Sequence, residues 1–99
     1  MQLSTNYIEQ IKQLCQQYNV ASLYAFGSVV TNNLKIDSDV DLLVRFYNIE
    51  IAKYFDNYNS LKLGLENVLG RKVDLLEEQA LKNPILIRSI NKNKELIYG

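Results

Sequence analysis

Near the start of the chain, apolar residues recur at steps of three and four positions. The stripe consists of Ile8, Ile11, Leu14, Cys15 and Tyr18. This spacing places apolar side chains along one side of an α-helix. The pattern therefore predicts an amphipathic helix over residues 6–18. Because its thiol falls on the apolar stripe, the single cysteine is expected to be a buried core residue and not a reactive one.

The next two apolar segments have the pattern of β-strands. Residues 21–26 are short and apolar and end at Gly27, which predicts a buried strand followed by a tight turn. Residues 39–46 alternate, and the apolar positions Val40, Leu42, Val44 and Phe46 share one face. Since successive side chains of a strand point to opposite faces, the other face carries Asp39, Asp41, Leu43 and Arg45.

The second half of the chain repeats the alternation of helix and strand. A long apolar stripe predicts a helix over residues 49–69 that is capped by Gly70. A strand is predicted over residues 72–76, and Asn83-Pro84 is a typical start for a last helix over residues 84–93. We therefore expect one α+β domain over residues 1–99, a two-layer structure with a small mixed sheet. Its helices should pack on one face and leave the other face, or its edge, open for a site.

The composition narrows the possible functions. Apolar residues make up 47% and charged residues 22%, which is typical of a globular protein. Eleven Lys and Arg balance eleven Asp and Glu, so the basic excess that non-specific nucleic-acid binding requires is missing. With no His and one Cys, the chain lacks His-based triads, His-ligated zinc and internal disulfides. No signal sequence or membrane-length apolar run is present, so we expect a cytoplasmic protein without membrane contact.

Two carboxylates and a glycine turn are the first candidate site. Asp39 and Asp41 lie two positions apart on a strand, which sets their Cβ atoms roughly 6–7 Å apart on the same face. A divalent cation would relieve their repulsion, and oxygen ligands without His or Cys favour Mg²⁺ or Mn²⁺. Backbone N–H groups after Gly27, with the Ser28 hydroxyl, could bind a phosphate. The alternatives are a solvated strand face and an ordinary turn.

A third acidic residue, Asp74, lies within the apolar strand predicted over residues 72–76. If this strand lies beside the strand of Asp39 and Asp41, the three carboxylates can hold two metal ions. Such a site can activate a hydroxyl, orient a triphosphate and stabilise departing pyrophosphate. In a chain without His, Asp74 is also the natural candidate to assist deprotonation of the attacking hydroxyl. The alternative is that Asp74 pairs with Lys72 or Arg71.

The chain resembles the DNA polymerase β-like nucleotidyltransferases in one signature. This signature is Gly27-Ser28, ten intervening residues, and then Asp39-Val40-Asp41 followed by Leu42-Leu43-Val44. Its size, its element order, residues 72–76 and its end are most similar to the minimal nucleotidyltransferases, abbreviated MNT. The resemblance implies Mg²⁺-dependent transfer of a nucleoside monophosphate, such as AMP from ATP, to a hydroxyl. It also implies that Ser28 holds the triphosphate, that Asp39 and Asp41 hold metal ions, and that Asp74 is the third carboxylate.

The resemblance also implies a partner. Many MNT proteins are antitoxins encoded beside a toxin with a HEPN (higher eukaryotes and prokaryotes nucleotide-binding) ribonuclease domain, and some similar proteins modify a toxin tyrosine with AMP. Many relatives carry Ala-Arg-Gly where this chain has Val30-Thr31-Asn32. The missing arginine leaves two alternatives open beside an AMP-transferring antitoxin. One is an antitoxin that neutralises its toxin by contact alone, and the other is a nucleotidyltransferase for small molecules such as antibiotics.

Overall fold

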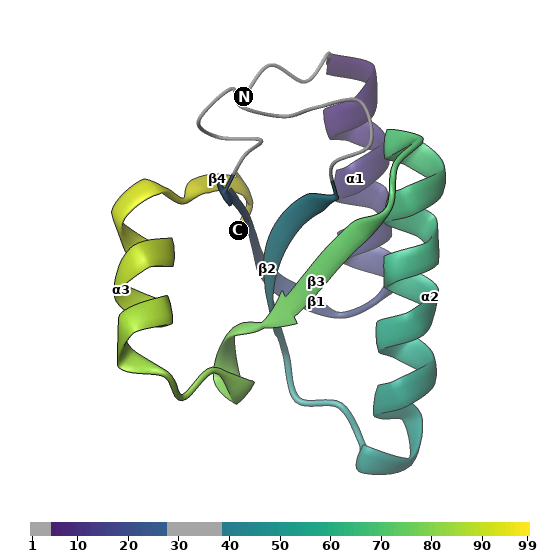
Figure 1. Cartoon of the computed structure of the whole chain (residues 1–99). Helices are drawn as coiled ribbons and strands as arrows, with labels where there is room; N and C mark the ends of the chain where they lie inside the picture. Colours follow the sequence, from purple (N-terminus) through teal and green to yellow (C-terminus); the bar gives the residue numbers. More distant parts are fainter. Residues whose placement is uncertain (1–4, 28–38) are drawn as a thin grey trace.

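The protein folds into three α-helices and a four-stranded mixed sheet in this computed structural model, which describes residues 5–27 and 39–99 (Figure 1). Every helix and strand predicted from the sequence is present, with ends shifted by two residues or fewer. The elements are α1 (Thr5–Gln17), β1 (Val20–Phe26), β2 (Val40–Phe46), α2 (Ile51–Leu69), β3 (Val73–Glu77), the short 3₁₀ helix η2 (Glu78–Ala80), α3 (Pro84–Asn93) and β4 (Glu95–Tyr98).

The sheet has the strand order β3-β2-β1-β4. Strand β1 pairs antiparallel with β2 on one side and with β4 on the other. Strands β2 and β3 are parallel, because α2 carries the chain back between them. The N-terminal ends of β2 and β3 therefore meet at the same end of the sheet as the C-terminal end of β1.

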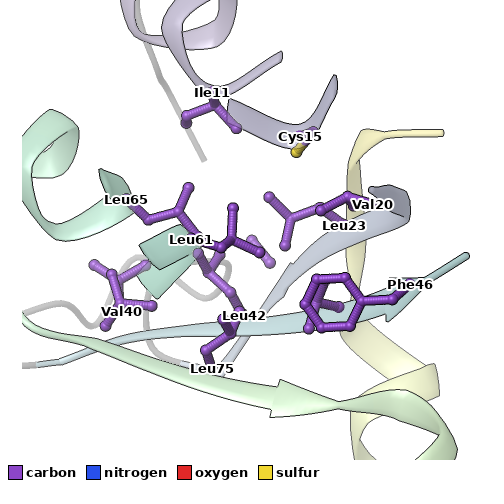
Figure 2. Close-up of a cluster of buried hydrophobic side chains, with 13 residues drawn as sticks. Ile11, Cys15, Val20, Leu23, Val40, Leu42, Phe46, Leu61, Leu65 and Leu75 are labelled. Carbon is purple, nitrogen blue, oxygen red and sulfur yellow. The ribbon is translucent and has the colours of Figure 1, made fainter. Parts of the chain in front are cut away.

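The main core lies between one face of the sheet and the pair α1 and α2 (Figure 2). Ile11 and Cys15 come from α1, and Leu61 and Leu65 come from α2; all four are fully buried. They meet the apolar face of the sheet, which includes Leu23, Val40, Leu42, Val44 and Leu75. The prediction of Cys15 as a core thiol is confirmed, and burial raises the pKa of this thiol to about 12.

The third helix does not share the face that α1 and α2 cover. Figure 1 shows α3 on the opposite side of the sheet. Leu43 points away from the main core by strand alternation, yet it is only 2% exposed, because α3 brings Ile87 and Ile90 to the same side. The expected mixed sheet is confirmed, and α1 and α2 pack on one face of it as predicted. The prediction that all helices share this face is wrong for α3, which covers part of the other face.

The turns follow local sequence signals at two helix ends. Gly70 adopts the left-handed conformation with φ of 67°, and its N–H donates to the Glu66 carbonyl, so it caps α2 as predicted. The Asn83 side chain accepts hydrogen bonds from the N–H groups of Ile85 and Leu86 and caps the start of α3. The apolar pattern does not predict β4 or η2.

A search of the described helices finds none that is long and apolar enough to span a membrane.

Candidate active site

Two predicted site carboxylates meet where the parallel strands begin. Asp41 of β2 and Asp74 of β3 are Cα partners in the parallel register. Asp41 is also the Cα partner of Phe26 on β1, and Gly27 follows Phe26 directly. Neighbouring strands lie about 4.8 Å apart, so three segments distant in the sequence converge within one strand spacing of Asp41. The condition that Asp74 must lie beside the Asp41 strand is met.

The carboxylates lie on the sheet face that α1 and α2 leave uncovered. Val40 and Leu42 point into the core, so strand alternation directs Asp41 to the other face. Asp74 lies between the buried residues Val73 and Leu75 and takes the same direction. Asp41 is half-buried, whereas Asp39 and Asp74 are exposed. One carboxylate is therefore held firmly by the fold, and two others are open to a ligand.

The electrostatics show that Asp74 and Asp39 both act on Asp41. The pKa of Asp41 is raised above its ordinary value, first because burial disfavours the charged form. Repulsion from Asp74 contributes next, followed by repulsion from Asp39. Like charges that raise the pKa of Asp41 favour a bound cation, because a positive ion offsets the repulsion and restores the ionised form.

Gly27 brings the backbone up to the Asp41 carboxylate. Its φ is 73°, a conformation that residues with a side chain rarely adopt. A Cβ atom at this position would collide with Oδ2 of Asp41 and lie 3.3 Å from its Cγ. The missing side chain therefore lets this backbone approach the carboxylate closely. Ser28, the predicted phosphate-binding residue, lies outside the described residues.

The donor set fits Mg²⁺ or Mn²⁺. Among the described residues, no three Asp, Glu, His or Cys side chains are close enough together to form a complete metal-binding cluster. A Mg²⁺ ion in phosphate chemistry does not need one, since it commonly takes one or two carboxylates and completes its shell with water and substrate phosphates. The half-buried Asp41, with Asp74 and Asp39 near enough to raise its pKa, meets that requirement.

Arg45, Arg71 and Lys72 are the cations that could replace the missing arginine, and the structure separates Arg45 from Lys72. Arg45 lies four residues beyond Asp41 on β2, roughly 13 Å along the strand, and belongs to the far end of the sheet. Lys72 lies at the near end, because its carbonyl accepts a 2.9 Å hydrogen bond from the Val40 N–H. Lys72 can therefore reach the carboxylate end and Arg45 cannot. Residues 30–32, where relatives carry the arginine, lie outside the described residues.

Two further side chains near the site escape sequence-based detection. The Lys94 ammonium lies 4.3 Å from the ring centroid of Tyr24, on the same sheet face as Asp41. The Tyr58 hydroxyl donates to the carbonyl of Leu75, the residue after Asp74, and so ties α2 to β3. Tyr58 is partly buried and packs against the core. Neither contact has a signal in the sequence, since each joins elements that are separate in the chain.

Comparison with known proteins gives a consistent result. Residues 9–99 match the family model described as polymerase beta, nucleotidyltransferase. A protein of Methanocaldococcus jannaschii, named as a proposed protein adenylyltransferase, is 40% identical over 88% of this chain and 84% of its own length. A solved structure of a proposed minimal nucleotidyltransferase superposes with a TM-score of 0.74 at 32% identity, covering 91% of this chain and 88% of that one.

A more distant structure shares the fold. It contains a tri-AMPylated HEPN toxin of Shewanella oneidensis in complex with an MNT antitoxin. The TM-score is 0.66 at 17% identity, and the match covers 98% of this chain and 73% of that one. At this identity the likeness extends to the fold alone.

Proposed function

This chain belongs to the polymerase β nucleotidyltransferase family, and from that membership we propose that it transfers AMP from ATP to a hydroxyl group of a HEPN toxin partner. The observation that carries the proposal is the pairing of Asp41 with Asp74 beside the Gly27 backbone, which approaches the Asp41 carboxylate closely. The relative named as a proposed protein adenylyltransferase supports AMP as the transferred group. The complex of an MNT antitoxin with an AMPylated HEPN toxin supports the choice of acceptor.

The proposed binding roles follow from the position of each residue. Asp39 and Asp41 would hold Mg²⁺, with Asp74 as the third carboxylate of a two-ion site. The chemistry that Mg²⁺ supplies when bound is neutralisation of the triphosphate charge and of the departing pyrophosphate. Gly27 is proposed to bind the triphosphate through the backbone of its tight turn, which lies close to the Asp41 carboxylate. Ser28 is proposed to hold the triphosphate from the adjoining position.

Asp74 is proposed to accept the proton of the attacking hydroxyl. It is exposed, so an acceptor can reach it and the proton can pass on to water. The acceptor oxygen forms a bond to the α-phosphorus, and the bond from that phosphorus to the oxygen bridging to the β-phosphate breaks. Pyrophosphate leaves, AMP stays on the acceptor, and the hydroxyl proton resides on the Asp74 carboxylate.

The test is a transfer assay with ATP labelled at its α-phosphate. The chain is incubated with Mg²⁺ and labelled ATP, with and without the protein encoded by the neighbouring gene. Asp41→Asn removes the central carboxylate, and Asp56→Asn is the matched control, because Asp56 is an exposed acidic residue on α2. We expect label on the partner with the wild type and with Asp56→Asn, and at most trace label with Asp41→Asn.

Other outcomes would favour the alternatives. A folded wild type that binds and neutralises the partner without transferring label would indicate an antitoxin that acts by contact alone. Neutralisation that survives Asp39→Asn/Asp41→Asn would support the same conclusion. Transfer of label to a small hydroxyl compound, with no label on the partner protein, would indicate a small-molecule nucleotidyltransferase.

A further inference from the structure

Two side chains of α2 bind the backbone of β3 on either side of Asp74. The Glu66 carboxylate accepts a 2.9 Å hydrogen bond from the Val73 N–H. The Tyr58 hydroxyl donates a hydrogen bond to the Leu75 carbonyl. We propose that Tyr58 and Glu66 are positioning residues that hold Asp74 where AMP transfer requires it. The inference rests on the proposed role of Asp74 and deepens it, because it assigns the placement of this carboxylate to α2.

The strand that carries Asp74 lies at an edge of the described sheet. Among the described strands, only β2 pairs with β3. The Lys72 carbonyl faces β2, where it accepts a hydrogen bond from the Val40 N–H, and backbone directions repeat every two residues along a strand. The backbone of Asp74 therefore also faces β2, whereas Val73 and Leu75 turn theirs to the open edge. The contacts from α2 secure this edge directly before and after Asp74.

Glu66 controls the connection that leads from α2 into β3. Its backbone carbonyl accepts a 2.8 Å hydrogen bond from the Gly70 N–H, and its side chain accepts from the Val73 N–H. One residue thus holds both ends of residues 70–73, the segment directly before Asp74. The Glu66 carboxylate lies in the last turn of α2, where the helix dipole disfavours an anion. Its hydrogen bond to Val73 offsets this cost, because a charged acceptor makes a stronger bond than a neutral one.

Tyr58 is itself held in place by aromatic neighbours. Its ring stacks on Tyr54 with ring centroids 6.4 Å apart, and Tyr54 meets the buried Phe46 of β2 edge to face at 5.7 Å. Burial, and then the charge of Asp74, raise the pKa of Tyr58, so its hydroxyl stays protonated at neutral pH and remains a donor. The Leu75 carbonyl therefore meets a donor whose position is fixed by the core.

The separation of Asp74 from Asp41 depends on the position of β3. The two residues are Cα partners on parallel strands, which lie about 4.8 Å apart. A catalytic group that is misplaced by about 1 Å can cost about a hundredfold in rate. Loss of an edge contact should therefore slow the transfer step. It should leave ATP binding unchanged, because the triphosphate is proposed to be held by Asp39, Asp41 and Gly27 on or beside other strands.

Protection of the open edge is the competing explanation for these contacts. An exposed strand edge can pair with another chain, and side chains that cover the edge prevent this association. That role predicts self-association of a variant that lacks one contact, with an unchanged rate of transfer by the remaining monomer. The placement of Asp74 predicts the reverse, a monomer that transfers AMP slowly.

The experiment compares Tyr58→Phe with Asn57→Ala in the transfer assay with α-labelled ATP, Mg²⁺ and the partner protein. Asn57 is the matched control, because its side chain donates a 2.8 Å hydrogen bond from the same helix to the Tyr18 carbonyl and not to β3. Each variant loses one hydrogen bond, so each should have a melting temperature about 4–8 °C below that of the wild type. We expect only Tyr58→Phe to lower kcat, by about tenfold or more, with an unchanged KM for ATP.

A second pair of variants tests the contact from Glu66. Glu66→Gln keeps a side-chain oxygen that accepts from the Val73 N–H, whereas Glu66→Leu removes the acceptor and preserves the approximate size. Glu66→Gln should retain most of the wild-type kcat, and Glu66→Leu should lose about tenfold or more. Circular dichroism and size-exclusion chromatography check that each variant is folded and has the same oligomeric state as the wild type.

Three results would overturn the proposal. They are equal kcat values in Tyr58→Phe and Asn57→Ala, a wild-type kcat in Glu66→Leu, and self-association of these variants with an unchanged rate per monomer, which would assign both residues to edge protection. A wild type that transfers no label, or a fully active Asp74→Asn, contradicts the proposed function instead, which distinguishes the two failures.

Discussion

Replacing Gly27 with alanine separates two effects, backbone strain and displacement of the Asp41 carboxylate. Gly27 has a φ of 73°, and a left-handed conformation costs a residue with a Cβ about 1–2 kcal/mol. In a domain of this size each kcal/mol lowers the melting temperature by about 4–8 °C. Gly70→Ala is the matched control, because Gly70 has a φ of 67° and nothing lies within 4 Å of an added Cβ. Both variants should therefore lose similar stability.

Only one of the two variants should lose activity. At Gly27 the new methyl group collides with the Asp41 carboxylate, which must move by about 1 Å to restore ordinary van der Waals contact. A misplacement of about 1 Å in a catalytic group can cost about a hundredfold in rate. We therefore expect Gly27→Ala to transfer AMP about a hundredfold more slowly than the wild type, and Gly70→Ala to transfer it at the wild-type rate.

The assay is label transfer from α-labelled ATP in the presence of Mg²⁺, at a temperature well below the melting points of both variants. Thermal unfolding is followed by circular dichroism on the same samples. Equal losses of activity in Gly27→Ala and Gly70→Ala would mean that strain and not carboxylate placement governs the rate. Wild-type activity in folded Gly27→Ala would refute the close approach of this backbone to Asp41 as a requirement for catalysis.

Two further predictions concern titratable groups. The pKa of Asp41 is raised in the folded state, so ionisation of this carboxyl costs stability as the pH rises above its ordinary value of 3.8. In EDTA, Asp41→Asn should have a higher melting temperature than the wild type at pH 7, and the two melting temperatures should converge below pH 3.8. A difference in melting temperature that is constant at all pH values would contradict this cause. Burial raises the pKa of the Cys15 thiol from 9.0 to about 12, which lowers the thiolate fraction at pH 8 about a thousandfold. Ellman's reagent should therefore label Cys15 only in denaturant, and prompt labelling of the native protein would show that the thiol is accessible.

Within the described residues, the amino-acid sequence alone was sufficient to predict the three α-helices and three of the four strands. Apolar stripes at three- and four-residue steps define α1 and α2, and the alternation over residues 39–46 defines β2, because local periodicity determines which face an element can bury. The caps at Gly70 and Asn83 are equally local signals. The four-residue strand β4 is missed, since its pairing with β1 depends on an edge that exists only in the folded sheet.

The candidate residues could be named from the sequence, but their arrangement is a property of the tertiary structure. The spacing of Asp39 and Asp41 is local, whereas the pairing of Asp41 with Asp74 needs two parallel strands that 19-residue α2 connects. The same long-range pairing brings Gly27 against Asp41, separates Lys72 from Arg45, and sets α3 over Leu43. Local propensities determine the elements, and the burial of their apolar faces against one another decides which distant side chains meet.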